Sequence, residues 1–141
     1  MTDQAEFRVL GETAELLAVD KPAGLLVHPS KPGGPKTLWD GLRELLSYEI
    51  ANSGQVSLIN RLDRETSGVV LVAKTSAAAR QAAITMQEGK IRKTYLTILT
   101  GHPAEETFTV DAPIIRRGEV LETKIHLQRM VHPSGAVART E

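Results

Sequence analysis

The chain has 141 residues, of which 41% are hydrophobic and 24% charged, with 17 Lys and Arg balancing 17 Asp and Glu. This is the composition of one globular domain, and no run approaches the roughly 18 apolar residues that cross a bilayer. The zero net charge excludes an indiscriminate nucleic-acid binder, and the absence of cysteine excludes disulfides, thiolate catalysis and cysteine zinc sites. Residues 1–7 lack the basic start and apolar core of a secretory signal, so a cytoplasmic protein is expected.

The N-terminal third is expected to form two strands and a helix. Two apolar runs flank a turn at Gly11 and predict the strands. Thr37 and Asp40 fit a capping box ahead of apolar residues at helical spacing, and Trp39 is expected to anchor this helix in the core. The predicted ranges are 7–10 and 15–20 for the strands, 25–27 for a short extended piece, 28–36 for an exposed loop and 37–48 for the helix.

The rest of the chain is expected to be mostly strands with one further helix. Thr75 or Ser76 caps that helix and Gly89 ends it, whereas the other segments alternate or are rich in β-branched residues. The predicted ranges are 56–62 and 69–73 for two central strands, 77–88 for the helix, and 91–99, 107–115, 121–130 and 136–140 for further strands, with the last two paired. Many strands and two helices favour an α+β fold with a mostly antiparallel sheet, in a single domain over residues 1–141.

A polar loop between the two central strands holds the candidate chemistry, because Arg61, Asp63, Arg64, Glu65 and Thr66 crowd the ends of strands that should be buried. If the first strand continues into the loop, alternation places Arg61 and Asp63 on one face. Asp63 is a candidate nucleophile, since an oriented carboxylate can form an adduct with a carbon electrophile. Two alternatives are a loop carboxylate capping the amides near Thr66 and a glycosidase-like acid pair with Glu65. The pair is disfavoured by its spacing of about 7 Å and by the few aromatic residues.

Three motifs resemble those of the RluA-type pseudouridine synthases and occur in that family's order. The sequence NRLDRETSG, from Asn60 to Gly68, is similar to the family's signature loop, in which the aspartate is the nucleophile. The sequence LLAVDKPAGLLVHP, from Leu16 to Pro29, is similar to its N-terminal strand motif. The K-x-Y motif is matched at Lys93 to Tyr95.

The resemblance implies a pseudouridine synthase-like catalytic domain with a mixed, mostly antiparallel central sheet and no separate RNA-binding domain. It implies isomerisation of uridine in structured rRNA or tRNA, with no cofactor and no metal. Asp63 would be the catalytic nucleophile, Arg61 would fill the gap left by the flipped base, and Tyr95 would stack on that base. Asn60, Arg64 and Thr66 would contact the substrate. Metal binding is also not expected because the histidines lack close ligand spacing: His28, His102, His126 and His132.

Some features admit simpler readings or depart from the family pattern. Arg61 could form a surface ion pair with Glu65, and Tyr95 could be a core-edge residue. Asn60 stands where the family has histidine. Asparagine can form hydrogen bonds but does not titrate, so this position is not expected to transfer a proton. The family also continues beyond residues 138–140 with a basic segment. The chain is therefore expected to stop inside the domain, to be inactive and prone to aggregate by itself, and to recover both properties when a C-terminal segment is supplied. The alternative function is an inactive RNA-binding fragment of the same fold.

Overall fold

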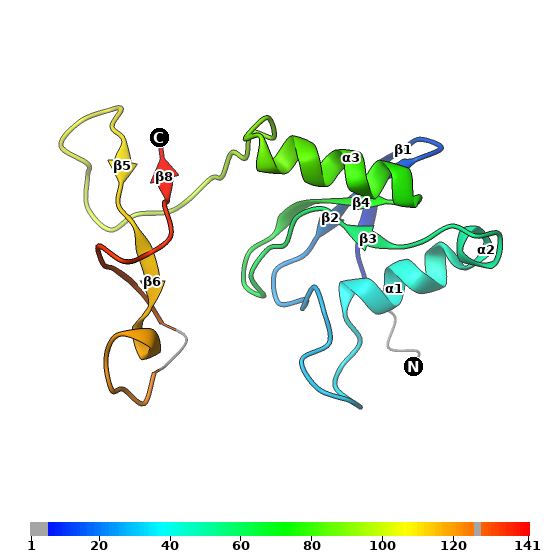
Figure 1. The fold of residues 1–141 in the computed structure, drawn as a ribbon, viewed down its shortest axis with the longest axis horizontal. Helices are drawn as coiled ribbons and strands as arrows, with labels where there is room; N and C mark the ends of the chain where they lie inside the picture. The colour runs from blue at the N-terminus through cyan, green and yellow to red at the C-terminus, as the bar shows by residue number, and fades with distance from the viewer. Residues whose placement is uncertain (1–5, 126–127) are drawn as a thin grey trace. The chain divides into compact units, whose positions relative to one another are not determined.

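The computed structural model describes residues 6–125 and 128–141. The chain divides into two compact units, Met1–Thr94 and Tyr95–Glu141 (Figure 1). The expectations for residues 1–5 and for His126 lie outside the described residues. Across the described ranges, no helix is long and apolar enough to cross a bilayer.

The first unit is built on a four-stranded antiparallel sheet with the order β1-β2-β4-β3. The strand β2 pairs with β4 along its whole length, from Leu16 opposite Ala73 to Lys21 opposite Gly68. The bounds are Arg8–Glu12 for β1, Leu16–Lys21 for β2, Ser57–Leu58 for β3 and Gly68–Ala73 for β4. The predicted strands are confirmed in place, but the one predicted over 56–62 is shorter because the chain leaves the sheet after Leu58.

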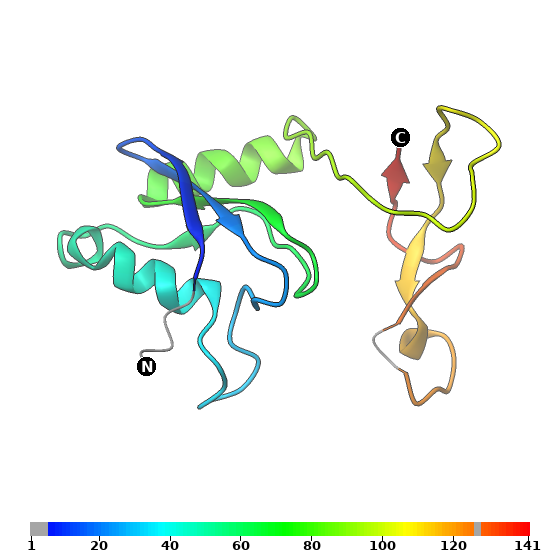
Figure 2. The same cartoon turned by 180° about the vertical axis from the view of Figure 1, so that it is seen from behind.

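Helices pack on the two sides of this sheet (Figures 1 and 2). The helix α1 spans Leu38–Leu45, α2 spans Ser47–Ala51 and α3 spans Ser76–Gln87. The predicted capping box is present, and Thr75 caps α3 by accepting a hydrogen bond from the Ala78 amide. The single helix predicted over 37–48 is two helices, because Leu46 at φ −95° and ψ 24° departs from helical geometry.

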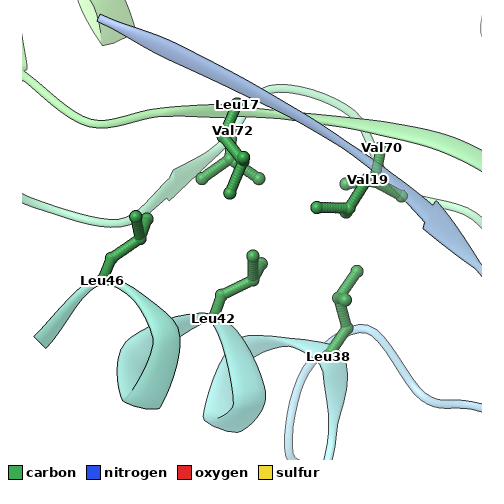
Figure 3. Close-up of a cluster of buried hydrophobic side chains, with 7 residues drawn as sticks. All are labelled: Leu17, Val19, Leu38, Leu42, Leu46, Val70 and Val72. Atoms are coloured by element: carbon green, nitrogen blue, oxygen red, sulfur yellow. The ribbon is translucent and has the colours of Figure 1, made fainter. Parts of the chain in front are cut away.

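The core lies between α1 and the sheet. Every fourth residue from Leu38 to Leu46 faces the alternating inward positions of β2 and β4, as Figure 3 shows. The buried cluster consists of Leu17, Val19, Leu38, Leu42, Leu46, Val70 and Val72. The prediction that Trp39 anchors the core is wrong: Trp39 is half-buried and contacts His28 and Arg43 instead. Its neighbour Leu38 takes the inward position.

The capping box of α1 gives a test of local stability with a defined pH dependence. Hydrogen bonds from the Thr37 hydroxyl and amide lower the pKa of the Asp40 carboxyl. A carboxyl whose folded-state pKa is lowered stabilises the fold at neutral pH and loses this effect as the pH falls toward the folded value. Thr37→Ala should therefore cost about 1–2 kcal/mol of unfolding free energy near neutral pH and less at about pH 2.5. Urea denaturation at both pH values measures this.

Thr75→Ala is the matched control, because Thr75 caps α3 without a carboxylate three residues later. Its cost should be similar at the two pH values. A cost of Thr37→Ala that does not shrink in acid would show that Asp40 does not act as half of the cap.

The second unit consists of two short antiparallel ribbons. The strand β5 (Val110–Asp111) pairs with β8 (Arg139–Thr140), and β6 (Ile114–Arg116) pairs with β7 (Arg129–Val131). A short 3-10 helix, η1, spans Arg117–Glu119. The predicted strand over 107–115 is split in two at Pro113, which has no amide hydrogen for a ladder. Every pairing among the described strands is antiparallel, which fits the predicted α+β fold with a mostly antiparallel sheet.

The predicted pairing of 121–130 with 136–140 is wrong. Both C-terminal segments pair with the 110–116 segment instead. The turn between them is fastened to that same segment, because the His132 amide donates to the Pro113 carbonyl at 3.0 Å. Gly135 lies so close to Ile114 that an added Cβ would be 2.7 Å from its backbone. The turn residues therefore form a crossover between two ribbons and not a hairpin end.

The predicted strand over 91–99 is also wrong. Its alternating sequence suits a strand, but no described segment supplies the hydrogen bonds that would make one. Leu96 and Ile98 are 101% and 98% exposed. Such exposed apolar side chains fit the expectation of association, which stays a prediction.

Candidate active site

The 59–67 loop joins β3 to β4 at the end of the sheet where β2 also ends. The loop contains a turn in which the Thr66 amide donates to the Asp63 carbonyl at 3.2 Å. It ends at Gly68, whose φ of +132° is a conformation that favours glycine. The side chains of Asp63, Arg64 and Glu65 are exposed. The turn from Asp63 to Thr66 therefore lies at the end of the sheet with the Asp63 side chain exposed to solvent.

Lys21 is the first anchor of this turn. It follows Leu17 and Val19 on the inward face of β2 and is fully buried, which is unusual for a lysine. Its ammonium donates to the carbonyls of Pro22 at 2.9 Å, Leu25 at 2.8 Å and Arg64 at 3.2 Å. All three of its N–H donors can thus be satisfied. Lys21 thereby ties the turn after β2 to the turn that carries Asp63.

Gly24 and Arg64 form a second anchor between the same two turns. The Gly24 amide donates to the Arg64 carbonyl at 2.7 Å, and Arg64 Nε donates back to the Gly24 carbonyl at 3.2 Å. Gly24 has a φ of +89°, so its backbone adopts a conformation that other residues rarely take. Two of the three sequence motifs therefore hold each other in place.

Asn60 connects the start of the loop to β4. Its Oδ1 accepts a hydrogen bond from the Leu71 amide at 2.9 Å, and its Nδ2 donates to the Val69 carbonyl at 3.0 Å. One acceptor and one donor of the side-chain amide are thus engaged by the sheet. Substrate contact by Asn60 stays a prediction, and the geometry shows that the residue also fixes where the loop begins.

The Asp63 carboxylate is exposed and does not cap the amides near Thr66, which was the simpler alternative for this residue. The Thr66 amide bonds the Asp63 main-chain carbonyl, and within the described residues no hydrogen bond to the carboxylate is present. Burial lowers the pKa of Lys21, whereas the negative charges of Glu65 and Asp63 act in the opposite direction. The buried ammonium is therefore within electrostatic range of the Asp63 carboxylate. The turn that carries the carboxylate is held by its main chain, and the carboxylate itself is left without a direct bond.

The remaining predicted residues differ in their placement. The 59–67 loop brings together Asn60, Arg61, Asp63, Arg64 and Thr66. Arg61 is exposed, and among residues 6–125 and 128–141 its side chain makes no ion pair, so the pairing with Glu65 is not formed. Tyr95 is the first residue of the second unit and its side chain is 58% exposed.

Sequence reasoning missed Lys21 and Gly24 as parts of this site. The signal was a lysine at an inward position of an apolar strand, two residues after Val19, followed by a glycine in a turn. A buried lysine needs hydrogen-bond acceptors. Only the fold shows that the Arg64 carbonyl, on the turn with Asp63, is one of its three acceptors.

Comparisons with known proteins fit this geometry. The sequence model described as RNA pseudouridylate synthase matches residues 15–140. An uncharacterised RNA pseudouridine synthase of Chloroflexus aurantiacus is 38% identical over 125 residues, which is 86% of this chain and 37% of that protein. The ribosomal large subunit pseudouridine synthase D of Nitrosomonas europaea is 35% identical over 136 residues, which is 94% of this chain and 37% of that protein.

A solved structure shows the same fold. Human RNA Pseudouridylate Synthase Domain Containing 1 superposes with a TM-score of 0.68 at 23% identity, covering 94% of this chain and 47% of the human chain. The chain thus spans little more than a third of the two bacterial relatives and about half of the human structure.

Proposed function

This chain belongs to the RNA pseudouridylate synthase family, and we propose that the protein isomerises uridine to pseudouridine in structured RNA, with Asp63 as the catalytic residue. The observation that carries the proposal is the exposed Asp63 carboxylate on a turn that Lys21, Gly24 and Asn60 hold in place. Uridines of rRNA or tRNA are the proposed substrates, which places the proposed activity in the cytoplasm.

The reaction breaks the bond between N1 of uracil and C1′ of ribose, turns the base, and forms a bond between C5 and C1′. C5 then loses its proton and N1 takes one up, so substrate and product are isomers and no external oxidant or group donor is needed. Asp63 could start the reaction by attacking C1′, by attacking C6 of the uracil, or by removing a ribose proton. All three routes require a carboxylate held in a defined place, and Lys21, Gly24 and Asn60 fix the loop that carries it.

Base flipping is the second part of the proposal. A uracil stacked in folded RNA is out of reach of any side chain until it leaves its stack, which costs a few kcal/mol. The exposed guanidinium of Arg61, two residues before Asp63, is suited to fill the gap because its plane can both stack and donate hydrogen bonds. Arg64 and Thr66 are proposed to contact the RNA beside it, with the Arg64 side chain also retaining its bond to Gly24.

Tyr95 is proposed to stack on the flipped uracil. Tyr95→Phe keeps the aromatic face, so RNA affinity should be preserved, whereas Tyr95→Leu should weaken binding by about 1–3 kcal/mol. Fluorescence anisotropy with a labelled RNA hairpin measures both. The matched control is Tyr48→Leu, because Tyr48 is the other tyrosine of the chain, is exposed and lies on α2. Equal losses for Tyr95→Phe and Tyr95→Leu would instead assign the role to the hydroxyl.

The proposed function is tested by tritium release from 5-tritiated uridine in rRNA and tRNA transcripts. One arm uses the 141-residue chain and the other uses the product of the full open reading frame that encodes it. Release in either arm, with pseudouridine identified in the digested RNA, supports isomerisation. If both arms bind RNA without releasing tritium, the alternative function, an inactive RNA-binding fragment, is supported. If neither arm binds RNA or releases tritium, RNA is rejected as the substrate.

A further inference from the structure

Beyond the end of β3, the side chain of Asn60 makes two hydrogen bonds to β4. The Ile59 amide donates to the Leu71 carbonyl at 2.8 Å, as in a regular antiparallel ladder. Such a ladder would return a bond from the Leu71 amide to the Ile59 carbonyl. The Leu71 amide donates instead to Oδ1 of Asn60 at 2.9 Å. The side-chain oxygen of Asn60 therefore stands in for a main-chain carbonyl.

The next position of the ladder is filled in the same way. Continuing the register of β3 against β4 places Arg61 opposite Val69, so the Arg61 amide would be the regular donor to the Val69 carbonyl. Nδ2 of Asn60 takes that place at 3.0 Å. The carboxamide of Asn60 thus supplies one acceptor and one donor, as a peptide group does.

We propose that Asn60 is a positioning residue whose amide closes the sheet in place of the main chain of Ile59 and Arg61. Because the sheet edge is satisfied by the side chain, the main chain is released from β4 at that point and leaves the sheet in a fixed direction. It reaches Asp63 three residues later, where the Lys21 and Gly24 anchors hold the following turn. This inference rests on the proposed function and deepens it, since Asn60 then acts through Asp63.

The Asn60 amide does not titrate, so its two hydrogen bonds to β4 do not depend on its own protonation. The Leu71 amide needs an acceptor at all times. A neutral imidazole would offer one acceptor and one donor that diverge around the ring, and a protonated imidazole has two donors and no acceptor. Asparagine offers its acceptor and donor side by side and does not titrate. Asparagine at this position, where the similar signature loop has histidine, can therefore keep both hydrogen bonds to β4 at any pH that leaves the protein folded.

The first experiment reads the hydrogen bond without any activity. Amide hydrogen exchange followed by NMR should show a protected Leu71 amide in the wild type. Asn60→Ala should lower that protection by at least about tenfold. The matched control is Asn52→Ala, which removes a side chain that donates only to the Tyr48 carbonyl on α2 and should leave Leu71 unchanged. Unchanged exchange at Leu71 in Asn60→Ala would overturn the inference.

The second experiment separates positioning from substrate contact. With tritium release as the assay, Asn60→Ala should lower kcat by about 10- to 100-fold and leave the KM for RNA nearly unchanged. Asn60→His should acquire an activity loss below about pH 6.5, where imidazole loses its acceptor and the wild type does not change at this position. A raised KM with unchanged kcat would overturn the assignment in favour of substrate contact. The kinetic assay uses the product of the full open reading frame, and an inactive wild type of that product would reject the proposed function, while the exchange result judges Asn60 separately.

Discussion

Asp63→Asn is expected to abolish pseudouridine formation while leaving the fold intact. An amide cannot act as the nucleophile or take up a proton, and losing a single nucleophile costs about 10⁴-fold or more in well-studied enzymes. The fold should be unaffected because the Asp63 side chain is exposed and the turn is held by the Asp63 carbonyl, which the variant keeps. Tritium release measures the activity, and urea denaturation should give a midpoint within error of the wild type.

Glu65→Gln is the matched control for this prediction. Glu65 lies in the same turn, is exposed, and like Asp63 opposes the lowering of the Lys21 pKa. Its loss should leave most of the activity, because only Asp63 is assigned to the chemistry. If Glu65→Gln were as inactive as Asp63→Asn, an acid pair would replace the single nucleophile. Near-normal turnover by Asp63→Asn would remove Asp63 from the reaction.

The first unit could be predicted from the sequence because its signals are local. The continuous apolar runs of β2 and β4 and the caps at Thr37 and Thr75 each depend on neighbouring residues only. Trp39 was misjudged because its position is one step along the helix from Leu38, and a helical pattern alone does not decide which of two adjacent apolar residues faces the sheet.

The strand pairings of the second unit could not be predicted in the same way. Alternation marks a segment as extended but does not say which partner it takes, and the pairing of 110–116 with two separate segments depends on long-range contacts. The 91–99 segment is an example: its residues alternate as in a strand, but no described segment pairs with it.

Most residues of the candidate site could be predicted from one loop and Tyr95 from the separate K-x-Y motif, whereas the supports of the loop could not be predicted. Asp63 and Arg61 stand out because charges beside a core need a reason. Lys21 does not stand out, because a lysine at a strand end is ordinary in sequence, and Asn60 is predicted only to contact the substrate. Their roles arise from main-chain partners on other segments, the Arg64 carbonyl and the Leu71 amide, which no sequence pattern reveals.

Lys21→Met should both destabilise the first unit and impair catalysis. Methionine keeps most of the buried apolar stem but removes the Lys21 donor from the Pro22 and Leu25 carbonyls, while the Arg64 carbonyl keeps the Gly24 amide. The loss should cost on the order of 2–3 kcal/mol after the relief of a buried charge. The turn that carries Asp63 loses one of its anchors, and the positive charge that interacts with the Glu65 and Asp63 carboxylates is removed. We therefore expect kcat to fall by about 100-fold or more with a smaller change in KM. Urea denaturation and tritium release measure the two effects.

Lys74→Met separates these effects, because Lys74 is the other buried lysine of the chain. It follows β4 at the end remote from Gly68 and pairs with Glu12 at 2.5 Å and Glu49 at 3.7 Å. Lys74→Met should also lower the urea midpoint, since it leaves two carboxylates without their cation, but it should keep kcat close to the wild-type value under conditions where both variants are folded. If Lys74→Met lost as much kcat as Lys21→Met, general destabilisation would explain both losses. A folded Lys21→Met protein with normal kcat would show that the Arg64 carbonyl and the Gly24 anchor suffice to hold Asp63.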